Sequence, residues 1–271
     1  MDLQTSQSFI PKQAFRPDAQ LYEEIVGDST ANIAKAFLGL IPPPGPDAII
    51  HDNGCGGGQV IGQIMETRPP ASIRIEATDI DPTQISNCAE AAVAGNWPVT
   101  TNLMPAESLD FPDETFTHSF ANLLLLATRD TGTHAAREMH RTLKPGGVAV
   151  ATWFASIPHQ EVIKEVHREL RGADAPPLPH GMPDEWYAED FLSSVMGRGG
   201  FAPEKIRAES VETVCKIADL QRWVTILWSY IGAPASGWTR ADEENWDKAI
   251  AMITDRIREL PGYKSTGPGV K

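Results

Sequence analysis

The sequence of 271 residues has few cysteines, no run of basic residues and no long apolar segment. Its three cysteines, Cys55, Cys88 and Cys215, are an odd number at wide spacing, which gives neither a disulfide framework nor a zinc site. The net charge of −13 argues against nucleic acid or an anionic membrane as the main partner, because both need a basic footprint. No apolar run is long enough to span a bilayer, and residues 1–9 lack the features of a signal peptide. We therefore expect a cytoplasmic globular protein without a bound metal.

The N-terminal part differs in composition from the rest of the chain. Residues 1–20 are polar, and apolar positions near helical period within 21–40 predict two short helices. The proline-rich stretch 42–46 then ends the second helix. We expect an N-terminal arm with cap helices over 1–40, and one larger domain over 41–271.

In the larger domain, short apolar runs alternate with helical stretches. Strands are expected at 48–52, 73–79, 99–103, 116–126 and 148–153, with helices between them at 60–66, 83–94 and 133–143. This alternation predicts a Rossmann-like α/β fold, with a mostly parallel central sheet and helices on both faces. Farther along, helices are expected at 159–170, 184–197, 219–231 and 242–260, and a long strand at 206–217. We interpret about 219–260 as a helical cap inserted over the site.

A glycine-rich turn follows the first expected strand and has the order acid-x-G-x-G-x-G, with Asp52, Gly54, Gly56 and Gly58. Such a turn lets backbone N–H groups and a helix N-terminus face a ligand, and side chains there would block it. The dinucleotide pattern needs a third glycine where this chain has Gln59. Asp52 would repel a pyrophosphate but suits the sulfonium and ammonium of S-adenosylmethionine. A purely structural turn is the alternative.

A second acid, Asp79, ends the second expected strand. In this topology a carboxylate there lies beside the cofactor ribose and can accept both hydroxyl protons. Binders of NAD also use an acid at this place, so Asp79 does not separate the two cofactors. Ile80 follows and could lie on an adenine face or be ordinary packing.

Four motifs occur in order: Asp52 to Gly58, Thr78 to Asp81, Pro105 to Asp113, and Leu143 to Gly147. Together they resemble class I S-adenosylmethionine-dependent methyltransferases of the ubiquinone-biosynthesis type, over roughly residues 20–260. Within that family the chain is most similar to fungal small-molecule methyltransferases of the gliotoxin bis-thiomethyltransferase type. The features shared with this group are the N-terminal helices with Tyr22, the strand ending at Trp153 and the helical cap.

The resemblance implies roles for the matching positions. Gly54, Gly56 and Gly58 would contact the methionine portion and ribose, and Asp79 would hold the ribose hydroxyls. Ala106 and Glu107 would border the adenine. Asn122 would lie under the cofactor near the substrate, and Tyr22 would close over the cofactor. The residues in these roles are Tyr22, Asp52, Gly54, Gly56, Gly58, Asp79, Ile80, Ala106, Glu107 and Asn122.

The sequence departs from the family at two places. Pro105 stands where the family usually has an acid, which removes one expected adenine contact. The chain also ends at 267–271, where a seventh, antiparallel strand should begin. Either the chain is truncated or the sheet is completed otherwise, for example by a neighbouring chain in a homodimer. An open sheet edge is an aggregation hazard.

The expected chemistry is methyl transfer to an oxygen, nitrogen or sulfur of a small, largely apolar metabolite, in secondary metabolism, with S-adenosylhomocysteine as product. Alignment supplies much of the acceleration, so a base is optional. His159 and His180 are the candidate bases, although a structural role suits each of them better. Three tryptophans, Trp153, Trp186 and Trp223, are expected on the substrate side, where aromatic walls suit a flat acceptor. Core packing is their alternative role.

Three other functions stay open at this stage. The first is a cofactor-binding protein of the same fold that promotes rearrangement or cyclisation of a small molecule without methylating it. The second is an NAD-dependent oxidoreductase, which Asp52 and Gln59 disfavour. The third is a regulatory module that binds a partner.

Overall fold

The computed structural model describes residues 9–16, 19–179 and 182–265. The chain divides into two compact units. The sheet unit comprises residues 28–155 and 183–215, and the helical unit comprises 1–27, 156–182 and 216–271. The sequence-based division into an N-terminal part (1–40) and a larger domain (41–271) differs from these two units, and it stays a prediction.

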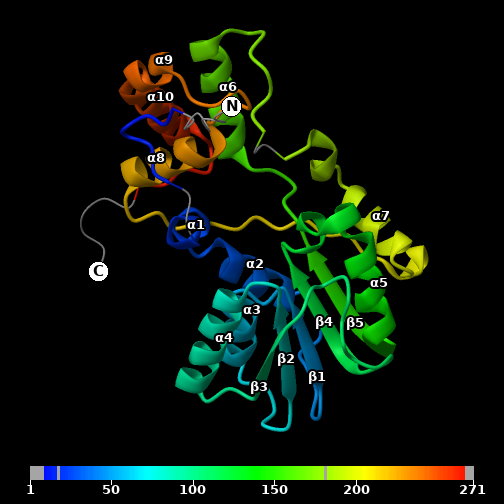
Figure 1. The fold of residues 1–271 in the computed structure, drawn as a ribbon. Coiled ribbons are helices and arrows are strands. Elements are labelled where there is room, and N and C mark those ends of the chain that lie inside the picture. The colour runs from blue at the N-terminus through cyan, green and yellow to red at the C-terminus, as the bar shows by residue number, and fades with distance from the viewer. Residues whose placement is uncertain (1–8, 17–18, 180–181, 266–271) are drawn as a thin grey trace, which may run out of the picture. The chain divides into compact units, whose positions relative to one another are not determined.

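The sheet unit is built on five parallel strands in the order β3-β2-β1-β4-β5 (Figure 1). The strands are β1 (Ile49–Asn53), β2 (Arg74–Asp79), β3 (Val99–Leu103), β4 (Phe116–Asn122) and β5 (Leu143–Thr152). After β1 the chain adds β2 and β3 on one side and then returns to place β4 on the other. The strand order therefore reverses between β1 and β4, where open α/β sheets bind their ligands.

Helices cover both faces of this sheet, as the alternating pattern predicts. One face packs against α2 (Ser29–Leu38), α3 (Gln59–Glu66) and α4 (Pro82–Gly95). The other packs against α5 (Thr133–Thr142) and α7 (Phe191–Arg198). Ile50 and Phe120, both without exposed surface, belong to the first core, and Ala121 and Met139 belong to the second. The Rossmann-like expectation is confirmed.

Short 3-10 helices complete the sheet unit. They are η1 (Leu125–Ala127), η2 (Arg129–Gly132), η3 (Asp184–Tyr187) and η4 (Pro203–Lys205).

The helical unit contains α1 (Ala19–Val26), α6 (Pro158–Arg171), α8 (Leu220–Ile231), α9 (Arg240–Glu244) and α10 (Trp246–Glu259). The apolar faces of α6, α8 and α10 form one core with several tryptophans. The Arg171 guanidinium lies 5.0 Å from the Trp228 ring and 5.2 Å from the Trp238 ring. Its Nε also pairs with Asp242 at 2.7 Å. None of the helices in the described part of the chain is long and apolar enough to cross a membrane.

Two expected elements have different bounds: β5 begins at Leu143 rather than at 148, and the helix expected at 242–260 is divided into α9 and α10. Three others differ more. The strand expected at 116–126 ends at Asn122, because Leu123 takes a left-handed conformation (φ 57°) that extended chain cannot continue. The helix expected at 184–197 is two pieces, η3 and α7, separated by three residues.

The third difference is the long strand expected at 206–217, where the structure has neither strand nor helix. Its apolar residues Val211 and Val214 are three positions apart, whereas a half-buried strand repeats every two. Both are exposed, at 48% and 63%, so no sheet face covers them. With this spacing and no partner strand in the described residues, the segment forms no strand, and its Val214 carbonyl instead accepts from Asn32 Nδ2 at 2.7 Å.

Candidate functional site

The expected cofactor residues of the sheet unit gather at one edge of the sheet. Because β1, β2, β4 and β5 are parallel, their carboxyl ends lie together. Asp52 and Asn53 end β1, Asp79 ends β2 and Asn122 ends β4. This edge includes the reversal of strand order between β1 and β4, so the topology itself makes a ligand site here.

The turn after β1 requires its glycines for backbone reasons. Gly54, Gly56 and Gly58 have φ values of 69°, 52° and 89°, a region that other residues rarely adopt. A Cβ added at Gly54 would also lie 2.6 Å from Leu124 Cδ1. Helix α3 begins directly after Gly58, so its first N–H groups point toward the turn. The turn therefore presents backbone rather than side chains to a bound group.

The neighbouring strand holds the turn in place. The Thr78 carbonyl accepts hydrogen bonds from the N–H groups of Gly54 (2.8 Å) and Cys55 (2.9 Å). Asp79 Oδ2 accepts the Gly56 N–H at 3.0 Å, and its Oδ1 accepts the Asp81 N–H at 3.0 Å. An ionised carboxylate has about four lone-pair positions, so Asp79 keeps capacity for ribose hydroxyls.

Asp52 differs from Asp79 because it has no such partners. Its side chain has no exposed surface, and neither carboxylate oxygen has a hydrogen-bond partner in the described structure. Burial raises the pKa of Asp52 well above its usual value, and Cys88 and Asp79 add to the effect. A buried carboxylate without partners is costly, so this position is suited to a cationic group.

A buried polar chain lies behind the turn, on the other side of β1 from Asp52. His51 Nε2 lies 3.0 Å from Thr78 Oγ1, which donates to Asn53 Oδ1 at 3.2 Å. The His51 ring stacks on Phe116 with a centroid distance of 4.6 Å. Burial lowers the pKa of His51 to about 3, so the ring is neutral and serves packing.

The expected adenine residues lie beside the end of β2. Ile80 is 71% exposed and is free to cover a flat ring. Ala106 is nearly buried at 8%, in the connection that begins where the Met104 N–H donates to the Asp79 carbonyl (3.0 Å). Glu107 Oε1 accepts the Arg129 N–H at 3.0 Å, which fixes the Glu107 side chain. These positions suit an adenine border, but their contacts with cofactor stay predictions.

Asn122 uses its amide within the protein. Its Nδ2 donates to the Thr30 carbonyl at 3.0 Å, and its Oδ1 accepts from Thr152 Oγ1 at 2.6 Å. Thr152 Oγ1 in turn accepts the Leu123 N–H at 3.0 Å. Asn122 therefore links α2, β4 and β5 at the site edge, and its role under the cofactor stays a prediction.

Two of the expected substrate tryptophans come together. Trp153 directly follows β5, and its ring meets the Trp186 ring edge-on at 5.7 Å. Phe154 adds a third ring, 5.9 Å from Trp153. The Trp153 Nε1 is buried without a hydrogen-bond partner in the described structure. These rings form an aromatic cluster in the same unit as the glycine turn.

The remaining candidates belong to the helical unit. Trp223 is 6% exposed, its Nε1 donates to the Ile25 carbonyl at 3.0 Å, and it belongs to the core of that unit. His159 lies in the first turn of α6, its ring is 5.0 Å from the Trp223 ring, and burial lowers the His159 pKa to about 4. The side chain of Tyr22, in α1, and the whole of His180 lie outside the described residues.

Sequence reasoning missed residues that contact the turn from other elements. Leu124 covers Gly54, and Cys88 in α4 lies near Gly58, whose added Cβ would be 3.3 Å from its Sγ. A hydrogen bond with Cys88, together with burial, raises the pKa of the Cys55 thiol, so that thiol stays protonated. No sequence pattern marks these contacts, because each joins positions far apart in the chain.

Taken together, the residues at this edge fit S-adenosylmethionine. The left-handed glycines leave room for a close ligand, Asp52 lacks a cationic partner, and Asp79 lies next to the turn. Gln59, which stands where a dinucleotide-binding turn has its third glycine, is the first residue of α3.

Comparisons with known proteins agree with this fit. Residues 51–151, which run from β1 to β5, match the sequence model of the methyltransferase domain family. No curated protein matches the chain. The match supports an enzyme of the methyltransferase class with S-adenosylmethionine as its cofactor.

Solved structures share the fold at low identity. A SAM-dependent methyltransferase from Aquifex aeolicus is 13% identical, with a TM-score of 0.51, over 68% of this chain and 89% of that chain. The cyclase SpnF is 16% identical, with a TM-score of 0.52, over 84% and 76%. The YcgJ protein of Bacillus subtilis is 19% identical, with a TM-score of 0.39, over 52% of this chain and 58% of that chain.

Proposed function

We propose that the chain transfers the methyl group of S-adenosylmethionine to an oxygen, nitrogen or sulfur of a small, largely apolar metabolite. The observation that supports this acceptor class is the aromatic cluster of Trp153, Phe154 and Trp186. It follows β5 at the same sheet edge as the glycine turn after β1. Aromatic rings favour a flat apolar acceptor, and few polar groups are needed to orient it.

Different residues of the sheet unit bind different parts of the cofactor. Asp52 is the partner for the ammonium, and Asp79 accepts from the ribose hydroxyls while it holds the Gly56 N–H. Ile80 covers one face of the adenine, and Ala106 and Glu107 border its edge. Because Asp52 is wholly buried, the side chains above it must shift to admit the ammonium.

The bound cofactor supplies a methyl group on a good leaving group. The protein then has to orient the acceptor in line with that methyl and keep water out. A thiol or phenol acceptor ionises near neutral pH with modest help, so no dedicated base is required. His159, with its lowered pKa, is neutral at pH 7 and stays a candidate base, as does His180.

Calorimetry with S-adenosylhomocysteine and NAD, side by side, tests the cofactor. We expect binding of the first and none of the second, and the reverse result would contradict the assignment.

Mass spectrometry of candidate acceptors, incubated with S-adenosylmethionine, then tests transfer. A mass gain of one methylene unit, together with S-adenosylhomocysteine, identifies an acceptor.

A second candidate function is rearrangement or cyclisation of a small molecule without methylation. The supporting observation is the fold shared with the cyclase SpnF over 84% of this chain. The same experiment separates the two functions. A cyclase would convert its substrate to an isomer of unchanged mass and would leave S-adenosylmethionine intact.

Three finer proposals rest on the sequence. We propose an acceptor of secondary metabolism, as in the fungal gliotoxin-type enzymes, which a panel of dithiol and phenol acceptors tests. The free cysteines Cys55, Cys88 and Cys215 support a reducing, cytoplasmic location. The outer edge of β5 has no strand beside it in the described residues, which supports a homodimer that light scattering would detect.

A further inference from the structure

The connection between β3 and β4, residues 104–115, carries the adenine-border residues but has no helix or strand. A hydrogen bond from the Ser108 N–H to the Pro105 carbonyl (3.1 Å) forms a turn within it. Ala106 and Leu109 are nevertheless buried, at 8% and 5% exposure. A segment this well packed without regular structure must be shaped by contacts from outside itself.

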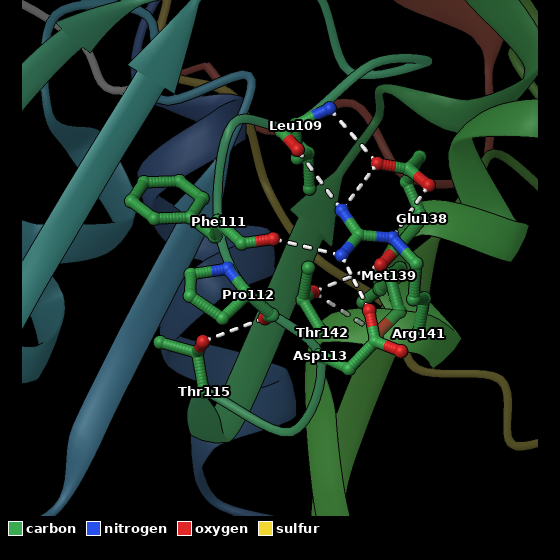
Figure 2. A network of polar contacts seen from close by, with 9 residues as sticks. All are labelled: Leu109, Phe111, Pro112, Asp113, Thr115, Glu138, Met139, Arg141 and Thr142. Atoms are coloured by element: carbon green, nitrogen blue, oxygen red, sulfur yellow. Dashed lines mark hydrogen bonds and ion pairs between the residues drawn. The ribbon is translucent and has the colours of Figure 1, made fainter.

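Arg141, in the last turn of α5, supplies these contacts (Figure 2). Its Nη2 donates to the Leu109 carbonyl at 2.9 Å, and its Nη1 donates to the Phe111 carbonyl at 2.7 Å and to Asp113 Oδ1 at 2.8 Å. Its Nε and Nη2 donate to the two oxygens of Glu138, at 2.8 and 2.7 Å. All five N–H groups of the guanidinium are thus used, three of them on the connection.

Glu138 completes the clamp from one turn earlier on α5. Its Oε2 accepts the Leu109 N–H at 2.9 Å, so both backbone polar groups of Leu109 are held by α5 (Figure 2). Hydrogen bonding to Arg141 holds the pKa of Glu138 below its usual value, and the acid is ionised at neutral pH. The pair makes charge-assisted bonds, which are stronger than neutral ones.

The border residues lie between two anchors. On one side the Met104 N–H donates to the Asp79 carbonyl, next to the carboxylate that holds the turn. On the other side Leu109 is clamped by Arg141 and Glu138. A segment of four residues between fixed ends has little freedom, so losing one end would release it.

We propose that Arg141 is a positioning residue for adenine recognition, acting through the β3–β4 connection and aided by Glu138. This rests on the proposed function, in which residues 106 and 107 border the adenine. Arg141 itself touches no cofactor. It sets where Ala106 and Glu107 lie, and thereby how well the site distinguishes adenine from another base.

The test compares Arg141→Lys and Arg141→Met with wild type by calorimetry, below the melting temperature of each variant. Two ligands are used: S-adenosylhomocysteine and its inosine analogue, in which a carbonyl replaces the adenine amino group. Losing the bonds to Leu109 and Phe111 should raise the Kd for S-adenosylhomocysteine about tenfold or more, and bring the two Kd values closer together. Lysine should recover little, because a single ammonium cannot reproduce the planar fork.

The matched control is Arg207→Met, which removes an exposed arginine paired with Glu209 in the same unit. It should leave both Kd values unchanged. Asp113→Asn is a graded variant, since Asp113 is 74% exposed and its loss leaves the bonds to Leu109 and Phe111. Its effect should be much smaller than that of Arg141→Met.

Hydrogen exchange of the peptide covering 104–113 gives a second readout that needs no ligand. Exchange should be faster in Arg141→Lys than in wild type, with other peptides of the sheet unit unchanged. The proposal is overturned if either Arg141 variant melts earlier but keeps the wild-type Kd and base preference, because Arg141 would then only stabilise the fold. Failure of wild type to bind S-adenosylhomocysteine would instead refute the proposed function.

Discussion

Replacing Asp52 by asparagine should make the free protein more stable and the cofactor complex weaker. The substitution keeps the shape of a side chain that has no exposed surface and removes its charge. In the described structure neither oxygen of Asp52 has a hydrogen-bond partner, so no contact is lost when the carboxylate becomes an amide. Opposite signs for stability and binding are expected because the carboxylate is suited to a ligand rather than to the fold.

The size of the stability gain follows from the cost of a buried polar group without partners. That cost is about 1–3 kcal/mol, and more for a charged group. Asparagine is also unpaired but neutral, so we expect a gain of about 1–2 kcal/mol at neutral pH. For a domain of this size this corresponds to roughly 2–8 °C in melting temperature.

The gain should depend on pH in a defined direction. Burial raises the pKa of Asp52 in the folded chain above its unfolded value of 3.8. Above that value the folded state binds more protons at Asp52 than the unfolded state, so the contribution of Asp52 to wild-type stability falls as pH rises toward the folded pKa. The advantage of Asp52→Asn should therefore grow from about pH 4 upward, and urea unfolding across this range measures it.

Binding should change in the other direction. Loss of a charge-assisted bond to the ligand ammonium should weaken S-adenosylhomocysteine about tenfold or more in calorimetry. Methylthioadenosine, which has the adenosine but no ammonium, should bind wild type and variant equally. The reasoning fails if the variant is less stable than wild type, or if both ligands weaken alike.

Four other substitutions test packing and backbone strain in the sheet unit. Gly58→Ala places a Cβ at a φ of 89°, 3.3 Å from the Cys88 Sγ, and should cost about 1–2 kcal/mol in urea unfolding and weaken S-adenosylhomocysteine in calorimetry. Burial lowers the pKa of His51 to about 3, so the unfolded state binds more protons than the folded state below about pH 6.5. The His51 contribution to stability should therefore fall by about 2 kcal/mol between pH 7 and 5, measured by urea unfolding as the change in the difference between wild type and His51→Asn. Thr131, with a φ of 56°, should gain about 0.5–1 kcal/mol in urea unfolding when replaced by glycine, and so should Glu114 (φ 52°). Unchanged stability in both glycine variants would refute the claim of strain.

The sheet and its glycine turn were predictable because their signals are local. A short apolar run, an acid and alternate glycines occur within ten residues, and each glycine meets a backbone requirement that is visible in the sequence. Asp79 follows from the same logic, since parallel topology brings the end of β2 beside the end of β1. The sequence places Trp153 and Trp186 on the same expected substrate side. Their direct contact depends on η3, which carries Trp186.

Contacts between distant elements could not be predicted. The apolar run after Phe116 reads as one strand through Leu126, but Leu123 turns left-handed and directs Leu124 onto Gly54. The sequence gives Trp223 the same expected role as Trp153 and Trp186, yet its indole N–H donates to the Ile25 carbonyl within the helical unit. Arg141 precedes a recognised motif by two residues, and nothing in its neighbourhood indicates that three of its donors hold another loop.

The two acids of the turn show why a motif alone understates a site. Asp52 and Asp79 are both carboxylates at adjacent strand ends, and the sequence alone does not indicate which of them the protein itself hydrogen-bonds. In the structure Asp79 holds two backbone N–H groups and maintains the turn, whereas Asp52 holds none. A neutral residue would be better buried than an unpaired acid, so Asp52 does nothing for the fold that the described contacts show. A cationic ligand would give this buried carboxylate the partner that it lacks beside a turn that Asp79 already supports.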